Sequence, residues 1–527
     1  MKCYRYSISF YYVSYFCILS IIMINFIIRY PFVYHERSIY DSYFNHAMVT
    51  SILYNNNIPW YITPLSLFGF YPDSYPSGNP VLIAMFSEII HLDIENTILL
   101  QNFILSIFSI ILFFCITKKI YNNQTFYLLS SLIFSIMPKI IDYTYWDGSS
   151  RGLITILFPL ILLFCLIFYK KNNQIDKIKI LALILILFII FLSIHRSAIT
   201  ILLTLVIFLS IDIYSKVRKK ISILKFTKKN QISIIIILFI LALIIQIILS
   251  KINIFYIRSS SYSEQGYFIL NIPIFSAILN FFISYTGKSG LFLFVSIFGI
   301  YYIIYNIPEK KNYWLLLINL ICLIPFLIYS EYVSIYIFPI LAIFITIGII
   351  FILKQFKSYK KLSIIFVMIL ILASLLFSNY MINRWDSEKL GDTNYTYIQN
   401  NKTFETGIYL NYYCSDSPIL SSGHFNSYVA TIYSENYPQG TPFKKLDYLV
   451  IRWATFREYI TKPQEPYVIQ VKLYNTTTSK YFIEDSQYYG MTTWNFGHPS
   501  ISPYANMVHS SKYKIFDNGN NLLWYVR

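Results

Sequence analysis

The residues best suited to carry chemistry follow the first long apolar segment of the chain, in the run Ser38-Ile-Tyr-Asp41-Ser-Tyr-Phe-Asn-His46. Successive residues of a helix are rotated by about 100°, so a helix that begins near Ser38 has a polar face. That face comprises Ser38, Asp41, Ser42, Asn45 and His46, whereas Tyr40, Tyr43, Phe44 and Ala47 point the other way. The pattern predicts an amphipathic helix on a membrane surface, with its polar side turned toward a cavity. There the Asp41 carboxylate could act as a general base toward an acceptor hydroxyl, although Ser38-x-x-Asp41 also fits a capping box.

A second acidic stretch lies further along the chain, in Lys139-Ile-Ile-Asp142-Tyr-Thr-Tyr-Trp146-Asp147-Gly148. Carboxylates from this loop and from the Asp41 loop could share one divalent cation, because Mg²⁺ and Mn²⁺ prefer oxygen ligands. Asp41 and Asp147 are the predicted ligands of such a metal. The alternative is that these aspartates only form turns or helix caps, and Asp147-Gly148 is itself a turn signal.

Charged side chains at the predicted outer ends of the spans form a third group. His195 and Arg196 end one apolar segment and are followed at once by the next, so both lie at the membrane interface or just below it. An Arg there suits phosphate oxygens, although it could simply extend toward lipid headgroups. Arg258 belongs to an external loop long enough to fold over a site. Glu331 is the last charged residue near the outer face, or only a turn residue, and Asp73 lies in the proline-rich return of the first loop.

Membrane-spanning helices must position these residues. Of 527 residues, 56% are apolar and 13% are charged, and the mean hydropathy is +0.54. A soluble globular protein carries about a quarter charged residues, so this is a polytopic α-helical membrane protein. A segment of roughly 20 apolar residues crosses the bilayer, and shorter ones such as 272–285 are predicted to be re-entrant or interfacial. The predicted spans are 7–28, 97–117, 124–141, 152–169, 178–194, 197–214, 231–250, 288–306, 313–329, 333–353 and 361–379.

The net charge of +17 does not indicate a nucleic-acid partner, because the basic residues are sorted by side. With the N-terminus inside, cytoplasmic segments carry 21 Lys and Arg residues, and the opposite segments before residue 380 carry 8. The remaining 13 of the 42 follow residue 380. This bias is the positive-inside rule. It predicts about 11 transmembrane helices in the plasma membrane, with the N-terminus in the cytoplasm and the C-terminal tail outside.

Three regions are expected along the chain. Residues 1–96 comprise the first transmembrane helix and a large external loop, residues 97–379 the helical bundle, and residues 380–527 an extracytoplasmic mixed α/β domain. Of the six cysteines only Cys414 is expected outside, so no disulfide within the tail is predicted, and the chain has no CxxC or HExxH metal signature.

The tail has local signals for both strands and a helix. A hairpin with Gly519 in its turn is expected at 514–527, and a helix at 424–435. Strand-like runs of β-branched and aromatic residues occupy 417–422, 448–453 and 467–474. Asn-x-Thr sequons, typical of a glycosylated outer face, begin at Asn394, Asn401 and Asn475.

The order of these features resembles the GT-C superfamily of integral membrane glycosyltransferases. Asp41-Ser-Tyr-Phe-Asn-His46 is similar to the first-loop Asp motif of oligosaccharyltransferase catalytic subunits, and Tyr71-Pro-Asp-Ser-Tyr-Pro-Ser-Gly78 resembles the segment that ends that loop. The closing Phe516-Asp-Asn-Gly…Trp-Tyr-Val-Arg527 resembles the tail of archaeal members. The chain departs from the pattern in lacking the sequon-reading WWDYG motif, and in placing Asp147 before Arg151-Gly rather than after it.

The resemblance implies transfer of a sugar or oligosaccharide from a polyprenyl-phosphate-linked donor to an extracytoplasmic glycan or protein acceptor, with the donor's tail among membrane lipids. It implies that Asp41 is the base, or a ligand of Mn²⁺ or Mg²⁺ if the donor is a diphosphate. The residues expected to bind the phosphate leaving group are Arg151, His195, Arg196 and Arg258. Those expected to be accessory to the site are His46, Asp73, Asp147 and Glu331.

Two other classes of function stay open on the sequence. A transporter or lipid flippase needs polar residues at mid-membrane depth, and Asn319 is the clearest of the few present. A catalytically degenerate membrane scaffold or surface protein is the third reading, which an apolar cavity behind Asp41 would favour.

Overall fold

The protein is described from a computed structural model of the 527-residue chain. The residues that the structure describes are 2–31, 35–37, 41–58, 61, 64–69, 76–171, 173–202, 204–206, 208–209, 283, 285–305, 319–320, 323, 334–356, 359–387, 401–413, 419–421, 481–485, 512–517 and 521–526.

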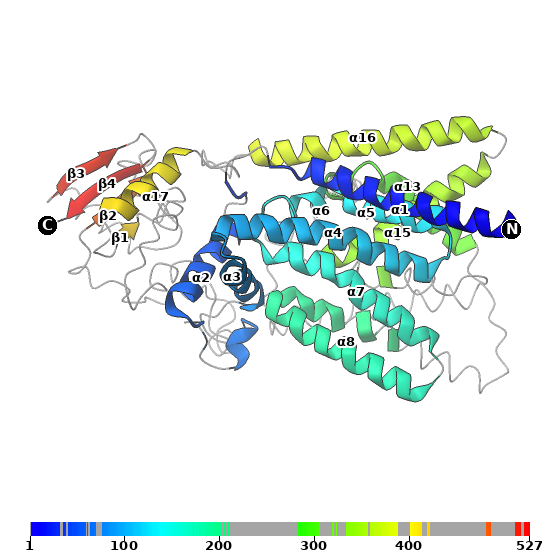
Figure 1. Ribbon diagram of the computed structural model, residues 1–527, viewed down its shortest axis with the longest axis horizontal. Coiled ribbons are helices and arrows are strands. Elements are labelled where there is room, and N and C mark those ends of the chain that lie inside the picture. The colour runs from blue at the N-terminus through cyan, green and yellow to red at the C-terminus, as the bar shows by residue number, and fades with distance from the viewer. Residues whose placement is uncertain are drawn as a thin grey trace, which may run out of the picture. The chain divides into compact units, whose positions relative to one another are not determined.

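The chain folds into two compact units, each assembled from separate stretches of sequence (Figure 1). We call the first the helical unit; it comprises Met1–Pro31, Asn102–Tyr145 and Arg151–Arg384. We call the second the loop-and-sheet unit; it comprises Phe32–Gln101, Trp146–Ser150 and Trp385–Arg527. The segment that follows α1, the five residues Trp146–Ser150 and the C-terminal tail thus belong to one unit. The division into 1–96, 97–379 and 380–527 stays a prediction.

Most of the predicted spans that fall on described residues are helices. Five helices are long and apolar enough to cross a membrane among the residues described: Ile94–Ile120, Ser150–Lys170, Gln174–Ile194, Ile335–Gln355 and Lys361–Asn383. The helices of predicted spans are α1 (Lys2–Ile28), α4 (Ile94–Ile120), α5 (Gln124–Ser135), α6 (Pro138–Asp142), α7 (Ser150–Lys170), α8 (Gln174–Ile194), α13 (Leu293–Tyr305), α15 (Ser334–Gln355) and α16 (Lys360–Ser387). The predicted span 231–250 lies outside the described residues, as do most of 313–329 and of the re-entrant segment 272–285.

Two predicted spans are not continuous helices. The span predicted at 124–141 is divided into α5 and α6, because Pro138 has no N–H for the helical ladder and pushes Met137 to ψ 134°. Pro138 instead opens α6, where its missing donor costs nothing. The span predicted at 288–306 begins as α13 only at Leu293, after Gly290, whose φ of +83° is a conformation open to glycine.

The packing of α13 against α15 depends on two glycines that face each other. A Cβ added to Gly348 would lie 2.2 Å from the carbonyl oxygen of Val295, and one added to Gly299 would meet the carbonyl oxygen of Phe344. The two backbones therefore approach more closely than any side chain permits. Close approach through small residues is how helices pack in a membrane, where lipid tails remove the hydrophobic drive between them.

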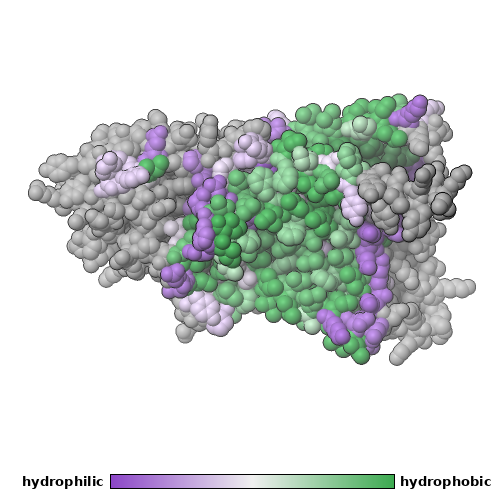
Figure 2. Space-filling view, in the orientation of Figure 1, coloured by the Kyte–Doolittle hydropathy of each residue, from purple (hydrophilic) through white to green (hydrophobic). Residues whose placement is uncertain are grey.

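The outer surface of the helical unit is apolar, and Figure 2 shows it as a broad green face over the helices. In the 18-residue apolar stretch of each helix, only 22% of the residues of α16 and 28% of those of α8 are buried inside the protein, against 83% for α15. Exposed side chains on α16 include Phe366, Met368, Ile369 and Leu372. A water-soluble protein rarely exposes so large an apolar area, so this surface fits the hydrocarbon of a bilayer.

The loop-and-sheet unit begins with α2 (Asp41–Asn55), followed by the 3-10 helix η1 (Pro64–Leu67) and α3 (Gly78–Ile90), and α2 packs against α3. The tail contributes α17 (Asn401–Tyr413) and four strands: β1 (Ile419–Ser421), β2 (Tyr481–Asp485), β3 (Lys512–Asp517) and β4 (Asn521–Val526). The strand order is β1-β2-β4-β3, with β1 parallel to β2 and the other pairs antiparallel (Figure 1). Helix α17 lies against β4.

The sheet confirms the local predictions that fall on described residues. The predicted hairpin is present as the antiparallel pair β3 and β4, with its predicted turn residue Gly519 outside the described residues, and β1 lies inside the predicted run 417–422. Strand β2 and helix α17 were not predicted, and α17 begins at the sequon residue Asn401. The predictions outside the described residues are the strands 448–453 and 467–474, the helix 424–435, and the sequons at Asn394 and Asn475.

Candidate active site

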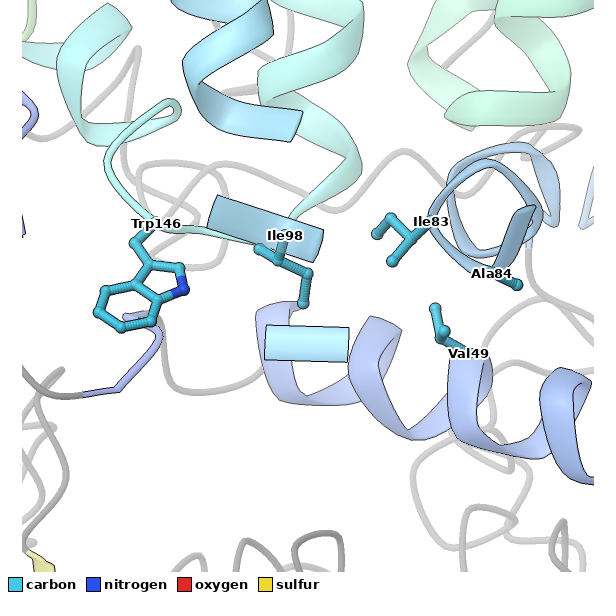
Figure 3. Close-up of a cluster of buried hydrophobic side chains, with 5 residues drawn as sticks. All are labelled: Val49, Ile83, Ala84, Ile98 and Trp146. Carbon is cyan, nitrogen blue, oxygen red and sulfur yellow. The ribbon is translucent and has the colours of Figure 1, made fainter. Parts of the chain in front are cut away.

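A small apolar cluster supports the first loop, the segment between α1 and α4 (Figure 3). It joins Val49 of α2, Ile83 and Ala84 of α3, Ile98 of α4 and Trp146 of the second loop. All five side chains are buried, and Val49 and Ile83 are wholly inaccessible. Burying side chains of this size contributes roughly 1.5–3 kcal/mol each. The cluster therefore fixes α2 against α3, α4 and the Trp146–Ser150 segment, within the loop-and-sheet unit.

A buried carboxylate, that of Glu36, organises the start of α2. Its Oε1 lies 2.6 Å from Nδ1 of His46, and its Oε2 accepts a hydrogen bond of 2.7 Å from Oγ of Ser42. The hydroxyl of Tyr43 donates to the carbonyl oxygen of Glu36 at 3.0 Å. The backbone N–H of Glu36 donates to Oε1 of Glu95 at 2.8 Å, and that carboxylate also lies 3.2 Å from Nδ1 of His35. Both oxygens of the Glu36 carboxylate therefore have partners, as is usual for buried polar groups.

These contacts correct part of the helix prediction. The residues Ser42, Asn45 and His46 of the predicted polar face are buried, and Tyr43, predicted to point the other way, is buried with them at 0% exposure. The reason is the hydrogen bond from its phenol to the backbone of Glu36, which draws it into the network. Helix α2 begins at Asp41, and Ser38, the other end of the predicted capping box, lies outside the described residues.

The second loop is held against the start of α2. The N–H of Gly148 donates to Oγ of Ser42 at 2.6 Å, and the N–H of Arg37 donates to the carbonyl oxygen of Trp146 at 2.9 Å. A Cβ on Gly148 would lie 2.9 Å from Oγ of Ser42, so glycine permits this approach. Because Ser42 follows Asp41 and Gly148 follows Asp147, this hydrogen bond joins the two segments that carry the predicted acidic residues.

Trp146 anchors this loop in a strained conformation. Its φ of +50° is unusual for a bulky L-residue and costs about 1–2 kcal/mol. The indole N–H donates to the carbonyl oxygen of Glu95 at 3.1 Å, and its ring belongs to the apolar cluster (Figure 3). Strain of this kind persists where the surroundings over-determine the conformation, which is typical of functional loops.

The carbonyl group of Gly148 is held by a side chain of α3. Nδ2 of Asn79, in the first turn of α3, donates to the carbonyl oxygen of Gly148 at 2.9 Å. Nε2 of Gln101 in turn donates to Oδ1 of Asn79 at 2.9 Å. Gly148 is thus hydrogen-bonded through both its N–H and its carbonyl group, which leaves the loop little freedom to shift.

The charge of Glu36 dominates the electrostatics of the network. Burial by itself lowers the pKa of His46, but the charge and hydrogen bond of Glu36, with Glu95 and Asp93, raise that pKa above its ordinary value. Burial, reinforced by Glu36 and Glu95, also raises the pKa of Tyr43 well above its usual range. His46 is therefore favoured as a cation that balances a buried carboxylate, while Tyr43 stays a neutral donor.

The structure describes part of the predicted acidic set. The backbone of Asp41 forms the first residue of α2, and its side chain lies outside the description. Asp147 is buried, with 9% exposure, and its Oδ1 accepts from the N–H of Ser149 at 2.8 Å. His46, predicted as accessory, is bound to Glu36. Asp142 pairs with Lys139 at 2.7 Å within α6, which supports the local structural role for that residue.

Of the four residues predicted to bind the donor phosphate, the structure describes the side chains of two. Arg151 is half-buried in the first turn of α7, and His195 lies between α8 and the 3-10 helix η2 (Arg196–Ile199). Nδ1 of His195 accepts from the N–H of Ser197 at 3.1 Å. The side chain of Arg196 and all of Asp73, Arg258 and Glu331 lie outside the described residues.

Sequence reasoning missed the residues that build the network. Glu36 and Glu95 were not predicted as site residues, although Glu36 stands ten positions before His46 and five before Asp41. An acidic residue between an apolar span and a polar helix was the available signal for Glu36. Nothing local marks Glu95, because its partners are the distant His35, Glu36 and Trp146.

No three His, Cys, Asp or Glu side chains are grouped to hold a metal ion within the described part of the chain. That set excludes the Asp41 carboxylate. Oxygen donors from two loops suit Mg²⁺ or Mn²⁺, and the meeting of the Asp41–Ser42 and Asp147–Gly148 backbones fits such a pair.

The sequence matches no protein-family model and no curated protein. Solved structures do match the fold over nearly the whole chain. The apo oligosaccharyltransferase of Archaeoglobus fulgidus has a TM-score of 0.57 and 11% identity, covering 98% of this chain and 74% of its own. The same enzyme in complex with Zn and sulfate has a TM-score of 0.54 and 11% identity, covering 97% and 73%. ArnT of Cupriavidus metallidurans bound to undecaprenyl phosphate has a TM-score of 0.54 and 10% identity, covering 98% of both chains.

Both of these neighbours are GT-C glycosyltransferases, so the chain has the GT-C fold of integral membrane glycosyltransferases, and the predicted resemblance is confirmed at that level. The fold and the apolar helices define a multi-pass membrane protein. The number of spans and the side on which the tail lies stay predictions.

Proposed function

We propose that this protein is a membrane glycosyltransferase that moves a sugar or oligosaccharide from a polyprenyl-phosphate-linked donor to an extracytoplasmic acceptor. The observation that carries the proposal is the hydrogen bond between Gly148 and Ser42, which brings together the loop segments of Asp147 and Asp41. The oligosaccharyltransferase and ArnT neighbours, the latter bound to undecaprenyl phosphate, support a lipid-linked donor.

In this proposal Asp41 acts as the general base that takes the proton of the acceptor hydroxyl or amide. Its backbone is held at the first turn of α2, one residue before Ser42, which is clamped between Glu36 and Gly148. Glu36 and His46 are wholly or almost wholly buried, so they position α2 rather than contact the acceptor. Such support is what keeps a reacting group within the small tolerance that proximity catalysis requires.

The phosphate of the donor would be held by Arg151, His195, Arg196 and Arg258. The guanidinium group presents a planar fork of donors that matches phosphate oxygens. Stabilising the charge that develops on the leaving phosphate at a poorly hydrated site lowers the barrier by several kcal/mol. Asp73 and Glu331 are proposed as accessory residues, and the tail as the region that binds or positions the acceptor.

A divalent cation would be held by Asp41 and Asp147 if the donor is a diphosphate. The structure of the Archaeoglobus fulgidus enzyme with Zn and sulfate supports metal binding in this fold. Such an ion would neutralise phosphate charge as a Lewis acid. Under this arrangement the N–H of Ser149 would help to fix the Asp147 carboxylate by donating to its Oδ1.

The test is glycan transfer from a native pool of lipid-linked donors, in membranes that contain the wild-type protein, Asp41→Asn or Asp176→Asn. Asp176 is a half-buried residue in the first turn of α8, where it pairs with Lys171 at 3.1 Å, and it serves as the matched control. We expect transfer to be abolished by Asp41→Asn and unchanged by Asp176→Asn, at equal protein levels. Equal activity of the Asp41 variant would remove that residue from the mechanism. Absence of transfer by the wild type, with Mn²⁺ or Mg²⁺ supplied, would favour a scaffold.

Transfer is also to be measured after chelation and after readdition of Mn²⁺ or Mg²⁺. If Asp41 and Asp147 are metal ligands, chelation abolishes transfer and readdition restores it. Activity that survives chelation would exclude the metal and leave Asp41 as a base alone.

A further inference from the structure

A second buried polar chain, made of hydrogen-bonded side chains, lies inside the helical unit. It starts at His195, where α8 ends, and runs through Ser197 to Tyr336 in the first turn of α15. Oγ of Ser197 lies 2.7 Å from Nδ1 of His195 and 3.0 Å from the hydroxyl of Tyr336. Ser197 and Tyr336 are separated by 139 residues, so the chain depends entirely on tertiary packing.

The contacts at Nδ1 determine the tautomer of His195. A backbone N–H is always a donor, and that of Ser197 points at Nδ1 from 3.1 Å, so Nδ1 is the acceptor and carries no proton. In the neutral imidazole the proton then resides on Nε2. The Ser197 hydroxyl can only donate to the same Nδ1, which leaves its own lone pairs for the Tyr336 hydroxyl.

Tyr336 cannot reach a substrate itself. Its side chain is 0% exposed and packs edge-to-face on Phe158, with ring centroids 4.8 Å apart. Ser197 is also buried, at 3% exposure, and Thr200 braces it by donating from Oγ1 to the Ser197 carbonyl oxygen at 2.6 Å. His195 is the one member of the chain that is half-buried rather than buried. This row of hydrogen-bonded side chains therefore has a rigid, buried end at Tyr336 and an accessible end at His195.

We propose that Ser197 and Tyr336 are positioning residues that hold His195 as a neutral Nε2–H donor toward a phosphate oxygen of a polyprenyl phosphate. This deepens the proposed function, on which it rests, by assigning the form in which His195 acts. A neutral donor binds the phosphate by direction rather than by net charge. The alternative is that His195 only caps the 3-10 helix η2 through its Nδ1.

The two accounts separate at one substitution. Asparagine is a favoured cap residue and places an acceptor oxygen near the position of Nδ1, but it does not reach the position of Nε2. His195→Asn therefore preserves the cap and removes the donor. If His195 were only a cap, this variant would behave as the wild type.

The experiment measures binding of a fluorescent polyprenyl phosphate to the full-length protein in nanodiscs at neutral pH, together with the melting temperature. We expect His195→Asn to keep the melting temperature and to weaken binding about tenfold or more, as expected for one hydrogen bond to a charged oxygen. Ser197→Ala and Tyr336→Phe are expected to weaken binding about threefold to fivefold by releasing the ring. The matched controls Ser193→Ala and Tyr301→Phe are expected to bind as the wild type.

A second readout follows the imidazole directly. In ¹⁵N-histidine-labelled protein, the His195 signals are identified by their loss in His195→Asn, and they should show an unprotonated Nδ1 and a protonated Nε2. Ser197→Ala and Tyr336→Phe should raise the fraction protonated at Nδ1. Unchanged polyprenyl-phosphate binding in His195→Asn, no measurable binding by the wild type, or a wild-type Nδ1 that carries the proton would each overturn the inference.

These readouts do not depend on glycan transfer. A wild type that transfers glycan while His195→Asn binds normally would refute the role of His195 alone. A wild type that binds polyprenyl phosphate through His195 without transferring glycan would instead refute the proposed function.

Discussion

Replacing Glu36 by Gln tests the network that supports Asp41. The carboxylate accepts a hydrogen bond from Ser42 at 2.7 Å, contacts Nδ1 of His46 at 2.6 Å, and is fully buried. Glutamine can still accept from Ser42 but loses the charged partnership with His46. Breaking a buried pair costs about 3–5 kcal/mol, and one hydrogen bond to a charged group about 1.5–3 kcal/mol, so we expect a loss of about 3 kcal/mol.

Hydrogen exchange of peptides that cover α2 is the appropriate assay, because the loss is local and the unfolding of a multi-pass protein is not two-state. A loss of about 3 kcal/mol corresponds to roughly 100-fold faster exchange through local opening. The matched control is Glu88→Gln, an exposed carboxylate of α3 in the same unit. Exchange in Glu36→Gln no faster than in Glu88→Gln would refute the energetic role of the network.

A double-mutant cycle assigns the loss to the contact with His46. We expect His46→Gln to accelerate exchange of α2 by itself and to add little once Glu36 is already Gln, with a coupling energy of about 1 kcal/mol or more. Additive effects of the two substitutions would show that the two side chains do not stabilise each other.

Three further outcomes follow from the same structure. Because the pKa of His46 is raised in the folded protein, its stabilising charge is fully present below about pH 6.5 and is lost as pH rises through the folded pKa. The protection of α2 against hydrogen exchange should therefore fall as pH rises, and protection that does not change with pH would contradict this. Gly148→Ala places a Cβ 2.9 Å from Oγ of Ser42 and should lower transfer severalfold without lowering protein yield, as measured in donor-saturated membranes. Gly348→Ala must move the backbone of α15 away from α13 and should cost about 1–3 kcal/mol of stability, seen as aggregation at a lower temperature on heating. The control Gly287→Ala meets only the flexible end of a methionine and should not lower the aggregation temperature.

The general architecture could be predicted from the sequence because its causes are local. Apolar runs as long as those of α7, α8, α15 and α16 can only satisfy their backbone polar groups in lipid as helices. The tail hairpin was also predictable, since the Gly519 turn and two flanking apolar strands are neighbours in the chain. The division of the predicted span 124–141 shows a local rule that the prediction passed over, namely the effect of Pro138.

The candidate site was predictable only in part. Asp41 is marked by its place after the first apolar span, and Asp147 by its turn, and both marks are visible in the sequence. Their proximity is not, because the bond that joins their loops connects Gly148 to Ser42 across 106 residues. Hydrophobic periodicity says which face of α2 is polar but not which partner that face will meet.

The sequence by itself determined a polytopic membrane protein with an aspartate soon after its first apolar span, because hydropathy, charge bias and turn chemistry act over a few residues at a time. Only the tertiary structure decided that Glu36 pairs with His46, that Glu95 meets Trp146, and that Tyr336 reaches His195 through Ser197. Each of these contacts exists because packing brings buried polar groups within hydrogen-bonding distance, where leaving any of them unpaired would cost about 1–3 kcal/mol. That cost depends on contacts made across the whole fold, so it cannot be predicted from any single stretch of sequence.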